Sequence, residues 1–264
     1  MVSAADRVKN PVRSSVWLET RQPARSRRTD QPAGLDRERI TAASVRLLDA
    51  EGLARFSMRR LAAELNVTAM SLYWYVDTKD DLLELALDAV YSEIAPPPAA
   101  PWQDRLRAVA AAYRGLLVRH VWVSPLAGRF LNLGPHALLV TRTVRDVIRA
   151  TGLPPESHGG ALSAVFQFVY GFGTAEGRFA RRSAEAGLSQ DEYVRQARAA
   201  IQEQPRLDGF VEDSPGLMAA RGGATVEETR ERDFAVALDL LIAGIDAMRE
   251  RARQGLSSPA PCPP

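Results

Sequence analysis

Four short apolar segments between residues 35 and 94, separated by capping residues, constrain the fold more than any other feature of the sequence. The first segment, residues 35–51, repeats its apolar residues at helical spacing and is followed by Gly52, a typical helix C-cap. Ser57 is placed to cap a second helix of about two turns.

The residues after the second helix predict a tight turn between it and a third helix. Asn66 suits the left-handed conformation that ends a helix, and Thr68 is suited to cap a third helix through Tyr75. Thr78, with Asp81 three residues later, predicts a capping box for a fourth helix to about Ile94. Two short helices joined at Asn66 form a helix-turn-helix, in which the second helix reads base edges in the major groove.

The remainder of the chain predicts further helices and no strands. Residues 95–101, "APPPAAP", are expected to form a linker or a stiff corner. The loop 205–223 is rich in glycine, proline and charge. The fold class is therefore all-α. The expected helices are Trp102–His120, a short one near Pro125–Phe130, Pro135–Ala150, Pro154–Ala186, Ser189–Glu203 and one from Thr225 to Arg253.

The composition bears on the cellular compartment and on whether the chain binds a membrane, a metal or a substrate. Cys262 is the one cysteine, so neither a disulfide framework nor a cysteine-based metal site within one chain is expected, which fits a reducing cytoplasm. No run of 18 apolar residues is present, so no membrane partner is expected. His120, His136 and His158 have no cysteine or carboxylate at metal or triad spacing. We therefore predict no enzymatic activity and no cofactor.

The first 34 residues carry seven basic and three acidic groups, whereas residues 36–94 carry seven basic and eleven acidic ones. An acidic domain gains little long-range attraction to DNA, so a flexible basic arm is the better candidate for it. We expect Arg25, Arg27 and Arg28 to reach a minor groove, the alternative being a solvated disordered tail. The apolar patch at residues 16–18 has no role that the sequence explains.

Three consecutive rings, Tyr73, Trp74 and Tyr75, lie in the expected third helix. Neighbouring helical positions point about 100° apart, so one buried face cannot accommodate all three rings. Rings with a polar group suit contacts with sugars and thymine methyls and donate hydrogen bonds to phosphate. The alternative is that these rings only pack the third helix against its neighbours.

The stretch "SMRRLAAELNVTAMSLYWYVDTKDDLLELALDAV" resembles the DNA-binding domain of the TetR family of bacterial transcriptional repressors, and "LYWYVDTKDDLL" resembles its tetracycline-repressor branch. "WQDRLRAVAAAYRGLLVRH", "GALSAVFQFVYGF" and "RDFAVALDLLIAGIDAM" resemble the regulatory domain of that branch in order and spacing. The resemblance implies a homodimer that binds double-stranded operator DNA and a small-molecule effector. It covers roughly residues 36–253.

The resemblance also implies which residues contact DNA. Ala69 departs from the pattern, because relatives often have a polar side chain there, so base reading is expected to depend on Arg59 and on apolar contacts to thymine. Arg60 is expected to be a solvated surface charge. The candidate DNA contacts are Arg59, Thr68, Ala69, Met70, Ser71, Tyr73, Trp74, Tyr75 and Lys79, with Arg25, Arg27 and Arg28 of the arm.

Tetracycline-binding relatives hold a magnesium–drug chelate with histidines. The matching positions here are Ala95 and Asn132, with Ala175 in place of an acidic contact, which argues against such an effector and against a metal. An apolar or aromatic small molecule is expected instead. Its candidate contacts, which are otherwise ordinary core residues, are Val109, Tyr113, Asn132, Val140, Val144, Leu162, Phe166, Gln167 and Tyr170.

The last helix carries the argument for dimers. Its apolar residues recur with spacings of four and three, as in a coiled-coil seam, and the helix from Pro154 has small residues that permit close approach. The alternative is burial inside one subunit. The seam comprises Phe234, Leu238, Leu241, Ile245 and Met248, and the small residues are Gly171, Gly173 and Gly177.

The expected organisation has four parts. Residues 1–34 form the arm, 35–94 a helix-turn-helix DNA-binding domain, 95–254 a larger helical ligand-binding and dimerisation domain, and 255–264 a disordered tail. The function expected is a ligand-responsive repressor that releases operator DNA. The alternative is a helical small-molecule binder or enzyme without a DNA role, which would need neither the helix-turn-helix nor the basic arm.

Overall fold

The computed structural model describes residues 15–18, 35–204 and 225–255. Every regular element in these ranges is a helix, so the all-α prediction is confirmed. By its contacts the chain forms two compact units. The first comprises residues 1–96 and 115–144, and the second comprises residues 97–114 and 145–264. No helix in the described ranges is long and apolar enough to cross a membrane.

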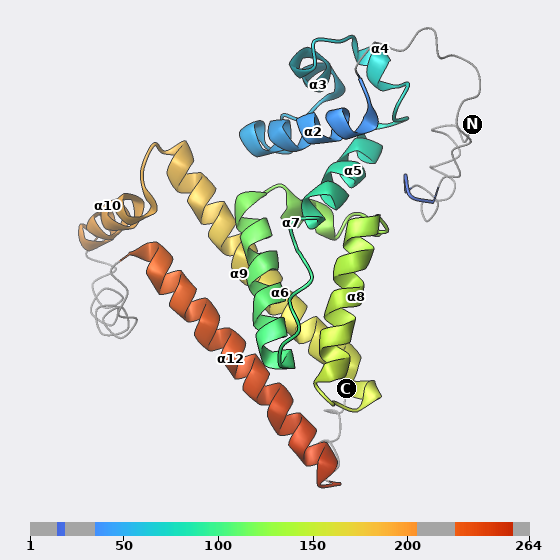
Figure 1. The fold of residues 1–264 in the computed structure, drawn as a ribbon. Coiled ribbons are helices and arrows are strands. Elements are labelled where there is room, and N and C mark those ends of the chain that lie inside the picture. Colours follow the sequence, from blue (N-terminus) through green and yellow to red (C-terminus); the bar gives the residue numbers. More distant parts are fainter. Residues whose placement is uncertain (1–14, 19–34, 205–224, 256–264) are drawn as a thin grey trace, which may run out of the picture. The chain divides into compact units, whose positions relative to one another are not determined.

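The first unit contains five whole helices among its described residues: α2 (Arg37–Glu51), α3 (Met58–Glu64), α4 (Ala69–Leu72), α5 (Lys79–Tyr91) and α7 (Val123–Ala127) (Figure 1). It also contains the end of α6 (Trp102–Arg119) and the first part of α8 (Pro135–Ala150). The cap residues predicted from the sequence begin three of them. Ser57, Thr68 and Thr78 each accept a hydrogen bond from the backbone amide three residues later. Asn66 has φ +53°, the left-handed conformation expected at the turn of the helix-turn-helix.

Some predicted boundaries are wrong. The third helix was expected to reach Tyr75, but α4 ends at Leu72, whose carbonyl accepts turn hydrogen bonds from Tyr75 and Val76. The short helix expected at 125–130 begins at Val123, because a proline is tolerated within the first turn, where the amides have no helical acceptor.

A short turn at residues 15–18 also belongs to the first unit and departs from the expectation of a flexible arm. Ser15 is buried, and its hydroxyl donates a hydrogen bond of 2.6 Å to Glu84 of α5. Trp17 and Val16 are half-buried, whereas Leu18 is exposed. The apolar patch therefore packs onto a helix 69 positions later in the chain.

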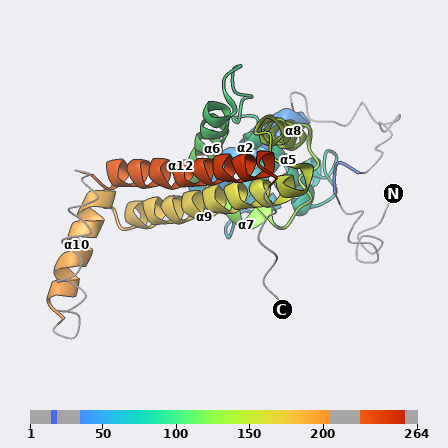
Figure 2. The ribbon, with the colours of Figure 1, turned by 90° about the horizontal axis from the view of Figure 1, so that it is seen from below.

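The second unit contains the first part of α6 (Trp102–Arg119), the end of α8 (Pro135–Ala150), η2 (Pro155–Ser157), α9 (His158–Glu185), α10 (Gln190–Gln202) and α12 (Val226–Arg253). The two long helices α9 and α12 lie side by side and run in opposite directions (Figures 1 and 2). Phe168 and Phe172 of α9 contact Phe234 of α12, with both centroid distances 5.3 Å.

The predicted seam on α12 is largely used inside the subunit. Phe234, Leu238 and Ile245 are buried within the described chain, as is Ile242, which the heptad pattern omitted. Leu241 is half-buried and Met248 is exposed. The interpretation of all five residues as one surface seam is therefore wrong. Apolar periodicity identifies the covered face of a helix but not the helix that covers it.

Candidate DNA-binding surface and effector site

Large apolar side chains are exposed on α4 and in the turn that follows it. Met70 is 70% exposed, Tyr73 44% and Trp74 43%, whereas Leu72 between them is fully buried. Leu72 faces the core with Leu61 of α3, so the helix must turn its other side outward. Thr68 caps α4, and its hydroxyl lies 2.9 Å from the hydroxyl of Ser71. The sequence argument that the three rings cannot share one buried face is consistent with this geometry.

Tyr75 and Lys79 also make contacts within the protein. The hydroxyl of Tyr75 donates a 2.6 Å hydrogen bond to the carbonyl of Leu35, just before α2, and burial followed by the charge of Asp36 raises the pKa of Tyr75. Lys79 is half-buried, with its ammonium 5.6 Å from the centroid of the Phe56 ring. Tyr75 therefore ties the recognition segment to α2, and Lys79 begins α5 beside it.

Among the described residues Arg59 is exposed and has no ion pair, which leaves its guanidinium open to an outside partner. Arg60 is also exposed but pairs with Glu51 of α2. The pairing agrees with the interpretation of Arg60 as a surface charge. Arg25, Arg27 and Arg28, the loop 205–223 and the tail from residue 256 lie outside the described residues.

In the second unit, three of the residues predicted for the effector form a ladder of rings. The Tyr113 and Phe166 rings stack with centroids 5.5 Å apart, and the Phe166 and Tyr170 rings stack at 5.9 Å. Tyr113 is buried, whereas Phe166 is 43% exposed. The ladder therefore runs from a buried ring on α6 to a partly exposed ring on α9.

With the exception of Asn132, the other residues predicted for the effector lie on several helices. Leu162 is half-buried and Gln167 exposed on α9, and Val109 is buried on α6. Asn132, Val140 and Val144 belong to the first unit. Asn132 has φ +49° and donates a 3.0 Å hydrogen bond to the carbonyl of Ala127, which fixes the end of α7.

Sequence reasoning missed a buried charged group that connects the helices of the first unit. Nδ1 of His120 lies 2.7 Å from Oδ1 of Asp49 in α2, and Nε2 lies 2.9 Å from Oε1 of Glu93 after α5. Arg119 also pairs with Glu93, and the indole of Trp122 donates to Asp49. Both ring nitrogens of His120 have a carboxylate acceptor, and only the imidazolium carries two donors.

Burial lowers the pKa of His120, but the hydrogen bonds and charges of Asp49 and Glu93 outweigh it and raise the pKa above 6.5. A raised folded pKa contributes stability that is complete below the unfolded pKa of 6.5 and is lost as pH rises through the folded value. We therefore expect the free energy of unfolding to fall as pH rises above 6.5. Urea titrations at a series of pH values measure this slope.

His120→Gln should flatten that slope, since the replacement does not titrate. His158→Gln is the matched control, because the His158 ring contacts the Leu153 carbonyl rather than a carboxylate. An equal slope in wild type and His120→Gln would contradict a charged His120.

The chain is similar to known regulatory proteins over most of its length. Residues 95–249 match the model of the tetracyclin repressor-like C-terminal domain, and residues 40–86 match that of bacterial regulatory proteins of the tetR family. The chain belongs to the TetR family of transcriptional regulators. Members of this family bind operator DNA and small-molecule effectors, and the family is one of regulators rather than enzymes.

Individual relatives support the same conclusion. An HTH-type transcriptional regulator of Saccharopolyspora erythraea is 36% identical over 197 residues, which cover 74% of this chain and 80% of the relative. The HTH-type transcriptional repressor DrrR1 of Streptomyces coeruleorubidus is 34% identical over 185 residues, 68% of this chain and 66% of that protein.

Solved structures extend the likeness to three dimensions. Apo ActR of Streptomyces coelicolor has a TM-score of 0.64 at 26% identity, covering 84% of this chain and 99% of ActR. ActR in complex with actinorhodin has a TM-score of 0.62 at 27% identity, covering 81% of this chain and 96% of that chain. This TetR-family regulator therefore shares its fold with a protein whose structure was solved in complex with actinorhodin.

Proposed function

We propose that this TetR-family regulator is a repressor that binds a palindromic operator as a homodimer and releases it when an apolar or aromatic small molecule binds. The observation that carries the DNA part is the exposure of Met70, Tyr73 and Trp74 around the capped helix α4. The stacked ladder of Tyr113, Phe166 and Tyr170 supports the choice of effector class. The actinorhodin complex of ActR supports it independently.

The experiment starts with DNA selected from a random pool by the full-length chain. A labelled duplex of the selected site is titrated by fluorescence anisotropy at several salt concentrations, with and without actinorhodin as the probe. We expect binding that weakens as salt rises, because phosphate contacts release counterions. We expect the probe to lower the affinity. Failure to enrich any sequence would contradict the proposal of a repressor. Enrichment without a response to actinorhodin would show that actinorhodin is not an effector of this protein.

The DNA surface is tested by Tyr73→Ala and Lys79→Ala. Each removes one proposed phosphate contact, so each should weaken binding of the selected duplex by about tenfold, and Lys79→Ala should also reduce the salt slope by about one. Arg60→Ala is the matched control, because Arg60 pairs with Glu51 within the protein. Equal effects of Lys79→Ala and Arg60→Ala would contradict the assignment.

The dimer is proposed to form through the exposed face of α12 rather than through the buried stripe. Val236 is 55% and Leu240 70% exposed, Met248 lies on the same side, and no atom lies within 4 Å of a Cβ built on Gly244. These four positions are spaced by four residues and share a helix face. Gly171 of α9 is equally open.

Leu240→Arg should therefore give monomers in sedimentation velocity, because a charge is costly in a dehydrated interface. Ala200→Arg on the exposed helix α10 adds the same charge elsewhere and should stay dimeric. If the Leu240→Arg protein is folded by circular dichroism and sediments as the wild type does, the interface lies on another surface.

The basic arm is proposed to add phosphate contacts to those of the domain. If it does, a chain without residues 1–34 has a smaller salt slope on the selected duplex. We likewise propose that residues 35–94 bind DNA and that residues 95–254 bind the effector and form the dimer.

A further inference from the structure

One face of α5 buries three carboxylates. Asp81, Glu84 and Asp88 are spaced by three and four residues, so they share that face, and they are 2%, 6% and 5% exposed. A buried carboxylate is costly unless hydrogen bonds replace its water. Each of the three carboxylates therefore needs hydrogen-bond donors from other parts of the first unit.

Asp81 and Asp88 receive hydrogen bonds from helix ends of the same unit. Oδ2 of Asp81 accepts from the backbone amides of Asp77 and Thr78, both at 2.9 Å, as part of the capping box. Oδ1 of Asp88 accepts from the amide of Ala137 in the first turn of α8 at 2.9 Å.

Glu84 receives its hydrogen bond from the N-terminal segment. The hydroxyl of Ser15 donates to Oε2 at 2.6 Å, and Ser15 itself is 4% exposed. Burial raises the pKa of Glu84, while hydrogen bonds from Ser15 and from the backbone of Val16 lower it. The segment therefore supplies donors to a carboxylate that α5 buries.

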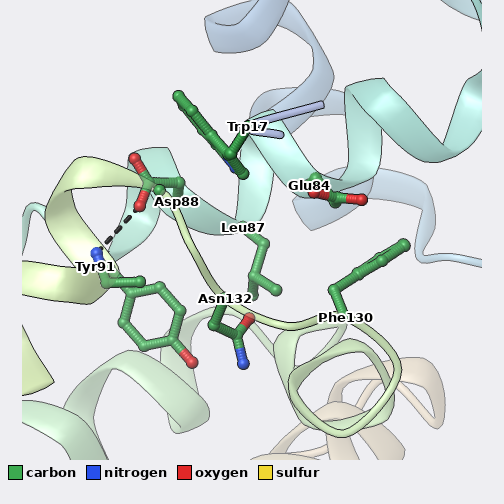
Figure 3. A pocket seen from close by; sticks show the side chains of 9 residues that line it. Trp17, Glu84, Leu87, Asp88, Tyr91, Phe130 and Asn132 are labelled. Carbon is green, nitrogen blue, oxygen red and sulfur yellow. Dashed lines mark hydrogen bonds between the residues drawn. The ribbon is translucent and has the colours of Figure 1, made fainter. Parts of the chain in front are cut away.

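The segment also covers apolar surface next to Glu84. Trp17 lines a pocket with Leu87 and Tyr91 of α5 and with Phe130 and Asn132 from the connection before α8 (Figure 3). Its indole therefore lies over the junction between α5 and that connection. Arg129 of the same connection pairs with Asp80 of α5 at 2.8 Å, so polar and apolar contacts hold the helix on this side.

We propose that Ser15–Leu18 is an anchor that docks on α5 of its own chain, with Trp17 in the pocket and Ser15 on Glu84, and holds this helix in place. Since α5 begins shortly after α4, the anchor restrains the element next to the recognition helix. Its importance for repression rests on the proposed function, but the docking does not.

Hydrogen exchange by mass spectrometry on the full-length chain without DNA or effector tests the anchor. Trp17→Ala removes the ring, and we expect α5 amides to exchange at least about tenfold faster, because opening of the helix then no longer costs its contact with the indole. Ser15→Ala should have a smaller effect of the same sign. Leu18→Ala, in the same turn but 50% exposed, is the matched control and should leave exchange unchanged.

Exchange in α12 of the second unit separates local loosening from global destabilisation, and it should not change in any of the three variants. Unchanged α5 exchange in both Trp17→Ala and Ser15→Ala would overturn the anchor. Isotope-labelled Trp17→Ala chains mixed with wild type distinguish the source of the segment. If their α5 regains protection, the segment docks from a second copy and the proposal of docking within one chain fails.

The anchor and the repressor can fail separately. Loss of α5 protection in Trp17→Ala, in a chain that selects no DNA, would support the anchor and reject the repressor. If the chain does select DNA, Trp17→Ala should lower its affinity for the selected duplex about threefold or more, because a loosened α5 leaves the recognition helix less ordered. An unchanged affinity with faster α5 exchange would overturn the link to the recognition helix.

Discussion

Arg114→Ala is expected to destabilise the second unit by about 3 to 5 kcal/mol, because it leaves the carboxylate of Glu176, whose side chain is only 11% exposed, without its partner. Arg114 of α6 is 7% exposed. Its guanidinium binds Glu176 of α9 through Nε at 2.7 Å and Nη2 at 3.0 Å, and it binds Glu231 of α12 through Nη1 at 2.6 Å. It also lies 4.6 Å from the centroid of Phe234. One side chain thus joins three helices.

Differential scanning calorimetry and urea unfolding measure this loss, which corresponds to a fall in Tm of about 10 °C for a chain of this size. Arg107→Ala is the matched control, since Arg107 pairs with Asp104 and Asp239 on the surface and should cost about 1 kcal/mol or less. Arg114→Met combined with Glu176→Met should recover most of the stability, because no buried charge then remains unpaired. A cost for Arg114→Ala no larger than that for Arg107→Ala would contradict the cluster.

Gly134→Ala is the second change with a large expected effect. A Cβ built on Gly134 would lie 2.2 Å from Cγ and Oδ1 of Asp88, far inside normal contact. Asp88 is not free to move away, because it accepts from the amide of Ala137 and lies 2.9 Å from Nδ1 of His136. The carboxylate also stabilises the positive N-terminus of α8.

We therefore expect Gly134→Ala to lower the free energy of unfolding by about 2 to 3 kcal/mol, as for overpacking at a rigid site. Gly128→Ala is the control, because a Cβ at that position meets no atom within 4 Å. Urea unfolding of both variants gives the comparison. Equal stability of the two would show that Asp88 and the α8 terminus adjust without cost.

Local signals in the sequence were sufficient for most helices. Ser57, Thr68 and Thr78 begin α3, α4 and α5 as predicted, because a hydroxyl that accepts a backbone amide acts within three residues. Asn66 has the predicted left-handed conformation for a similarly local reason. The helix-turn-helix resemblance was confirmed because its motif is contiguous. The ends of α4 and α5 were less accurate, since fraying and turn hydrogen bonds depend on what the last turn contacts.

The candidate sites were only partly accessible from the sequence. The rings at Tyr113, Phe166 and Tyr170 form one ladder, but Asn132, Val140 and Val144 belong to the other unit, and spacing along the chain contained no information on that division. Charged residues inside apolar runs were the signal that was overlooked. Arg114 in "AAAYRGLLV" and the acids of "DDLLELALDAV" interrupt helix faces that are otherwise apolar.

The sequence by itself determined the helical class, the caps, the helix-turn-helix and the family, because each depends on residues close together in the chain. The tertiary structure alone decided which distant partner each buried group meets. It placed Ser15 on Glu84, His120 between Asp49 and Glu93, and Arg114 between Glu176 and Glu231. It also turned the apolar stripe of α12 inward. The type of a side chain indicates whether it needs a hydrogen-bonding partner or burial. Only the tertiary fold decides which of many chemically similar residues lies close enough to supply it.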